Sequence, residues 1–132
     1  MNASSEDVKN MLVAESALGL EYGTDLFIGS EPTSPKNCVT IYDTAGFPPY
    51  LGLSTTGYEY PSIQIIVRNN DYMTGWSLAN DIKDLLHGQA NETWNSTLYT
   101  LIACVSGPAH LDYDNNDNAR FFINFNLQRR AV

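Results

Sequence analysis

The sequence predicts an α+β fold in which two helices pack on a mainly antiparallel sheet. Residues 5–18 and 70–87 carry apolar side chains at helical spacing. Residues 62–68 and 120–128 place alternate side chains on opposite faces, which is typical of strands with one packed and one wetter face. The predicted order of helix, strands, helix and strands differs from the repeated units of nucleotide-binding folds. With 132 residues, the chain is expected to form one domain over residues 1–132.

The first helix is expected over residues 5–18. Ser4 or Ser5 can accept hydrogen bonds from the unpaired N–H groups of the first turn. Gly19 is a natural stop. One face is mostly apolar, with Val8, Met11, Leu12 and Leu18 at helical spacing.

Strands are expected next at residues 26–28, 38–42 and 62–68, the second ending at Asp43. The first two are separated by a turn cluster with two prolines, residues 29–36. One face of the third strand carries Ile63, Ile65 and Val67.

A second helix is expected to begin after a cap at Asn70 or Asp71 and to end before Gly88. A polar connector, an apolar strand, a long polar link and a final strand follow, over residues 89–96, 98–105, 106–118 and 120–128. On the final strand, Phe121, Ile123, Phe125 and Leu127 point one way. Arg129 and Arg130 are expected to form a solvated tail, or else to pair with an acidic neighbouring subunit.

The charge balance bears on possible partners. Seven basic residues face fifteen acidic ones, a net charge of −8. Such a surface repels phosphate, which argues against sequence-specific binding of nucleic acid but not against DNA passing by. No apolar run is long enough to span a bilayer, so no membrane association is expected, and the N-terminus lacks the pattern of a secretory signal.

The sequence offers little support for catalysis or for a cofactor. Cys38 and Cys104 are expected to be free, and neither belongs to a C-x-x-C pair. No H-x-x-x-H, G-x-S-x-G or glycine-rich phosphate motif occurs. We therefore expect a protein that is not an enzyme and that uses no cofactor or metal.

A partial calcium-loop pattern lies late in the chain. Asp112, Asp114 and Asn116 match its first three ligand positions, but Asp117 stands where glycine is needed and Ile123 where a glutamate is needed. A solvated acidic turn is the preferred interpretation, and a weak cation site the alternative.

Residues 44–60, called the aromatic segment below, run for seventeen residues without a periodic pattern. Long irregular segments inside compact domains are usually functional. We interpret this one as a protein-contact loop, because prolines stiffen it and aromatic side chains are favoured at interfaces. The alternative is a loop folded over the edge of its own core. Its candidate contact residues are Phe47, Pro48, Pro49, Tyr50, Tyr58 and Tyr60.

Four stretches also carry a family resemblance through their order and spacing. They are I-Y-D-T-A-G-F-P-P at residues 41–49, the Y-P-S-I-Q-I run of residues 60–68, L-L-H-G at 85–88 and the late strand 120–127. Together they resemble the phage minor-capsid/tail-terminator family of long-tailed bacteriophages, over about residues 5–129. The resemblance implies a tail-terminator-like fold and a ring, typically of six copies, that caps the finished tail tube and docks the tail onto the head connector.

The resemblance sets the expected partners and sites. The partners would be other copies of the chain in a ring, the tail tube protein and the head connector or stopper protein, with DNA passing through the channel. The protein would reside in the tail–neck region of the virion after assembly in the host cytoplasm. Arg68 joins the aromatic residues as an expected interface residue, and Asp112, Asp114 and Asp117 are expected to line the DNA channel.

Three alternatives remain open at this point. Another neck component, such as a head-completion or connector protein, would share the same surface logic. A small hydrolase would need a convergent polar pocket with a perturbed base, which the sequence does not offer. A ligand-binding module would use aromatic side chains around a concave cleft.

Overall fold

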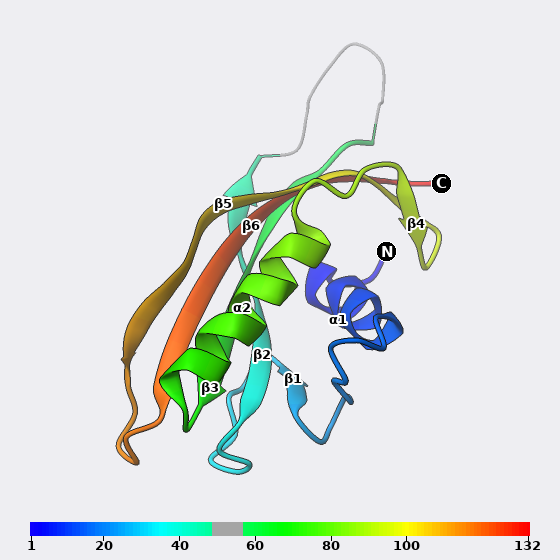
Figure 1. Ribbon diagram of the computed structural model, residues 1–132. Coiled ribbons are helices and arrows are strands. Elements are labelled where there is room, and N and C mark those ends of the chain that lie inside the picture. The colour runs from blue at the N-terminus through cyan, green and yellow to red at the C-terminus, as the bar shows by residue number, and fades with distance from the viewer. Residues whose placement is uncertain (49–56) are drawn as a thin grey trace.

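The computed structural model describes residues 1–48 and 57–132 (Figure 1). Two helices and six strands follow one another along the chain. They are α1 (Ser4–Ala14), β1 (Leu26–Ile28), β2 (Cys38–Phe47), β3 (Tyr60–Asn69), α2 (Tyr72–Leu86), β4 (Glu92–Trp94), β5 (Thr97–Tyr113) and β6 (Ala119–Ala131).

The six strands form one sheet in the order β1-β2-β3-β6-β5-β4. The short β1 pairs with β2 in parallel, and the other neighbouring pairs are antiparallel. Both helices lie on the same face of the sheet, α1 over β1 to β3 and α2 over β3, β6 and β5 (Figure 1). This arrangement confirms the predicted α+β class.

The core lies between the helices and this sheet face. On the central strand β6, alternate residues are buried and the residues between them are half-buried on the other face, as the sequence pattern predicted. The core also takes residues from both helices, so removing either helix would expose apolar surface. The largest fully buried side chains are Tyr99, Phe121, Phe125, Leu12, Leu26, Ile41, Ile63, Ile65, Ile82, Leu86, Ile102 and Ile123.

The opposite face of the sheet is polar near its centre. Ser62 on β3 donates its hydroxyl to the Asn126 side chain at 2.6 Å, and Asn124 donates to the Ser106 hydroxyl at 2.7 Å. These side chains satisfy one another where no helix covers the strands.

The start of α2 agrees with the sequence prediction, and the end of α1 does not. Asp71 caps α2 as predicted, because its carboxylate accepts from the Thr74 N–H at 3.0 Å. Helix α1 is shorter than predicted and ends at Ala14, since the backbone of Glu15 is extended. The predicted extension to residue 18 is therefore wrong, although Leu18 still packs against the core.

Three strand predictions need correction. Strand β2 continues past Asp43 to Phe47, because β3 provides a partner for those residues. Strand β5 continues to Tyr113 through several register shifts, so most of the predicted polar link is paired with β6. The predicted connector contains β4, which pairs with the start of β5. In each case the neighbouring strand supplies backbone partners that local composition does not reveal.

Two further findings concern the chain as a whole. Cys38 is a buried free thiol and Cys104 a partly buried one. In the described ranges 1–48 and 57–132, neither helix is long and apolar enough to cross a membrane.

Helix α2 packs closely against the sheet at Gly75. A Cβ atom there would lie 2.8 Å from Cε2 of Phe121 and 3.0 Å from Cβ of Asn69. Alanine favours a helix over glycine by about 1 kcal/mol, but overpacking costs roughly 1–3 kcal/mol. We expect Gly75→Ala to lower the free energy of unfolding, measured by urea denaturation. Ser77→Ala, on the exposed side of α2, serves as the control. A Gly75→Ala protein as stable as the Ser77→Ala protein would contradict this close packing.

Candidate functional site

The described residues of the aromatic segment lie at one end of the sheet. Phe47 closes β2 opposite Tyr60, the first residue of β3. The Phe47 side chain is 67% exposed, so it contributes little to the core. Pro48 is also exposed, and Tyr58 is half-buried beneath the guanidinium of Arg130, 6.0 Å from the ring centroid. The candidate residues Pro49 and Tyr50 lie outside the described residues.

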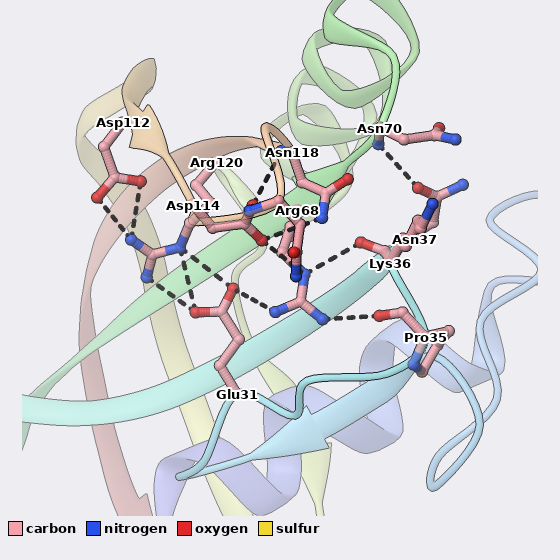
Figure 2. A network of polar contacts seen from close by, with 11 residues as sticks. Glu31, Pro35, Lys36, Asn37, Arg68, Asn70, Asp112, Asp114, Asn118 and Arg120 are labelled. Atoms are coloured by element: carbon pink, nitrogen blue, oxygen red, sulfur yellow. Dashed lines mark hydrogen bonds and ion pairs between the residues drawn. The ribbon is translucent and has the colours of Figure 1, made fainter.

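Arg68 lies near the opposite end of β3, away from these aromatic residues. Its side chain is buried and donates to the backbone carbonyls of Pro35 at 2.7 Å and Lys36 at 3.0 Å. It also approaches Glu31 at 3.5 Å (Figure 2). The guanidinium thus holds the turn before β2 within its own chain.

Arg120, at the start of β6, completes this network. Its Nη1 contacts both carboxylate oxygens of Asp112, at 2.8 and 2.9 Å, and its Nε and Nη2 contact Glu31 at 2.8–3.2 Å (Figure 2). Hydrogen bonds to Glu31, followed by those to Asp112, raise the pKa of Arg120. Glu31 therefore bridges two arginines from different strands.

Asp114 organises the turn between β5 and β6. Its carboxylate accepts from the N–H groups of Asn116 and Asn118, both at 2.9 Å, and from the Asn118 side chain at 3.1 Å. The Asn118 N–H contributes most to lowering the pKa of Asp114. Asp117 occupies the left-handed region with φ of 60°, where aspartate is tolerated. Of the residues that matched a calcium-loop pattern, Asp114 thus serves a backbone turn and Asp112 binds Arg120.

The acidic channel candidates differ in how they are compensated. Asp112 is paired with Arg120, and Asp114 lies 3.9 Å from Arg68. No ion pair involves Asp117 within residues 1–48 and 57–132. In the same ranges, no group of three or more His, Cys, Asp or Glu side chains is placed to hold a metal ion.

The sequence did not reveal the roles of two residues that make ion pairs within the chain, Glu31 and Arg129. Glu31 sits in a proline-rich turn, where nothing local indicates that it bridges two arginines. The prediction of a solvated tail is wrong for Arg129, which is 8% exposed and pairs with Glu59 at 3.2 Å. Arg129 follows the alternation of β6 and lies on its packed face. The polar residues beside it do not indicate that the strand continues this far.

A separate aromatic hollow of about 300 Å³ lies between the start of α2 and the last part of β5. Its walls include Tyr72, Met73, Trp76, His110 and Phe121. The Tyr72 ring stands edge-on to Phe121 with centroids 5.0 Å apart. This hollow is mainly apolar, with polar groups from His110, Tyr72 and Trp76 in its walls, and it lies near α2 rather than at the aromatic segment.

Comparisons with known proteins place the chain among phage proteins. A family model described as "Bacteriophage tail terminator protein" matches residues 15–130. A chain from a structure of the virion of a native gene transfer agent particle is similar in fold, with a TM-score of 0.59 and 18% identity. That alignment covers 98% of this chain and 94% of the other. No curated protein matches significantly.

The network around Glu31 yields a stability prediction. Glu31→Gln leaves Arg68 and Arg120 without their shared carboxylate, and the Glu31 side chain is only 13% exposed. We expect a loss of about 2 kcal/mol in the free energy of unfolding, measured by urea denaturation. The matched control is Asp112→Asn, which removes the half-exposed carboxylate on the same arginine and should cost less than about 1 kcal/mol. Equal losses in the two variants would contradict the bridging role of Glu31.

Proposed function

Because the chain belongs to the bacteriophage tail terminator family, we propose that it forms a ring at the head-proximal end of the tail tube. There it ends tube polymerisation and joins the tail to the head connector. The observation that carries this proposal is the family match, which runs from residue 15 to residue 130 and so includes the whole sheet except Ala131, the last residue of β6. Membership of this family makes the protein a structural component of a phage tail.

The surfaces support a ring closed by unlike patches. Phe47 and Tyr60 are paired across β2 and β3 at one end of the sheet, and Phe47 is largely exposed. Exposed aromatic side chains of this kind are favoured at protein interfaces. We propose that Phe47, Pro48, Tyr58 and Tyr60 contact the next copy, together with Pro49 and Tyr50. A patch that meets a different patch of its neighbour gives a cyclic assembly when the rotation closes.

The charge of the chain supports DNA passage without binding. The net charge is −8, and Asp112, Asp114 and Asp117 lie around one turn at the end of the sheet opposite Phe47. We propose that this turn approaches the channel. There Asp117 repels phosphate most strongly, because Arg120 and Arg68 compensate the other two carboxylates. Arg68 enters this proposal as an internal support of the turn before β2, since its donors are engaged within its own chain.

A second candidate is a binding module for an apolar ligand. The aromatic hollow near α2 favours it, since ligand sites are concave and mostly apolar. A protein that stays monomeric at high concentration and binds an apolar dye at Trp76 would support this candidate over a ring.

The first test addresses the ring interface. We expect the double variant Phe47→Ala, Tyr60→Ala to lose most of its assembled form in size-exclusion chromatography with light scattering. Tyr22→Ala removes a half-exposed aromatic ring from another part of the surface and is the control. If the double variant assembles like the parent protein, these residues do not form the interface.

The second test separates a terminator from another neck component. A phage lacking this protein is expected to make overlong tails, because tube growth has no stop. Loss of a connector would instead give tails of normal length that fail to join heads. Electron microscopy of lysates measures both, and normal-length unattached tails would contradict the terminator proposal.

A further inference from the structure

Helix α1 lacks a cap from its own chain segment. Its N-cap residue is Ala3, which has no side-chain acceptor. Asp43 on β2 supplies one instead. The Ser5 N–H donates to Oδ1 of Asp43 at 3.0 Å, and the Ser5 hydroxyl donates to Oδ2 at 2.6 Å. A carboxylate in this place also suits the positive end of the helix dipole.

Asp43 lies within β2, four residues before the strand ends at Phe47. The first turn of α1 is therefore bonded directly to the last part of β2. We call residues 43–48 the β2 stem and residues 57–60 the β3 stem.

The β3 stem is fastened to the end of β6. The Glu59 N–H donates to the carbonyl of Arg129 at 2.8 Å, and the Arg129 N–H donates back at 3.0 Å. The two side chains form an ion pair at 3.2 Å. Glu59 and Arg129 are thus joined through both backbone and side chain.

Arg129 also connects the end of β6 to the N-terminus and, through Tyr99, to α1. Its Nη1 donates to the carbonyl of Asn2 at 2.8 Å and to the hydroxyl of Tyr99 at 3.2 Å. The Tyr99 hydroxyl donates in turn to Oδ2 of Asp7, in the first turn of α1. The N-terminus therefore lies beside the end of β6, as Figure 1 shows.

The chain of hydrogen bonds from Arg129 through Tyr99 to Asp7, called the relay below, is buried. Asp7 and Tyr99 have no exposed surface, and Oδ1 of Asp7 has no hydrogen-bond partner among the described residues. Burial raises the pKa of Asp7, against the opposing effects of the Tyr99 hydroxyl and of Arg129. A buried carboxyl held at this cost needs each of its partners, so the relay has little freedom to rearrange.

We propose that the first turn of α1 is a clamp on the β2 stem and the β3 stem. It holds the β2 stem through Ser5 and Asp43, and the β3 stem through Asp7, Tyr99, Arg129 and Glu59. The clamp fixes the positions of Phe47 and Tyr60 at this end of the sheet. Its consequence for assembly rests on the proposed ring, because those two residues are the proposed contacts.

Hydrogen–deuterium exchange of the full chain tests the clamp with two single-residue variants. Ser5→Ala removes one bond to Asp43, and Tyr99→Phe removes only the relay hydroxyl. In each variant we expect amides of both stems to exchange roughly fivefold faster, the size expected when one helix cap is lost. Amides at the centre of β6 should keep the parent rates. Ser16→Ala and Tyr22→Phe, both exposed, are the matched controls and should change neither set.

Two results would overturn the clamp. Unchanged exchange in both stems would show that α1 does not hold them. Equal acceleration at the stems and at the centre of β6 would show a contribution to global stability alone.

The assembly consequence is tested separately. The exchange measurement needs no partner, so a parent protein that forms no ring would defeat the proposed function and leave the clamp standing. If the parent forms a ring, Tyr99→Phe should assemble measurably more weakly than Tyr22→Phe, by light scattering over a concentration series. Equal assembly of these two variants, despite faster stem exchange in Tyr99→Phe, would show that the clamp has no part in the ring.

Discussion

The structure depends on the central position of β6. Its alternate residues bury Phe121, Ile123 and Phe125 beneath the helices, and its two neighbours β3 and β5 pair with it along most of their length. An arginine stands near each end of the same strand. Arg120 joins Glu31 and Asp112 at one end, and Arg129 joins Glu59, Asn2 and Tyr99 at the other. The same strand therefore contributes to the core and to the polar contacts at both ends of the sheet.

Because three of the arginines bind groups within the chain, the charge of the protein surface is affected. The chain has only seven lysines and arginines against fifteen acidic residues, and Arg68, Arg120 and Arg129 bind acceptors within their own chain. Burying a guanidinium is tolerated only when its donors are satisfied, so these three side chains are committed to internal contacts. The surface left for partners is correspondingly acidic. That balance suits a protein that phosphate does not attract, and it makes apolar and aromatic patches the main candidates for adhesion.

The sequence predicted the parts of the fold that local patterns determine. Alternation on β6, the apolar stripe of α2 and the cap at Asp71 all depend on residues close together in the chain. The lengths of β2 and β5 were underestimated because their last residues are held by neighbouring strands rather than by strand-like composition. For the site, sequence could name Phe47 and Tyr60 as candidates. It could not foresee that Glu31 meets two arginines, because those contacts join residues 37 and 89 positions apart.

The two ends of the sheet differ in chemistry, and this difference matters for the proposed function. One end presents the exposed Phe47 beside Tyr60, while the other presents a turn held rigid by Asp114 and by the pairs of Arg68 and Arg120. A ring built from such subunits by rotation alone has two unlike faces, because rotation about one axis never exchanges them. A ring that ends a polymer needs this inequality: one face must accept the last layer, and the other must offer no site for another. In the proposed ring this asymmetry is necessary for a stop to growth but not sufficient, because every cyclic ring has two unlike faces and the stop depends on what the second face lacks.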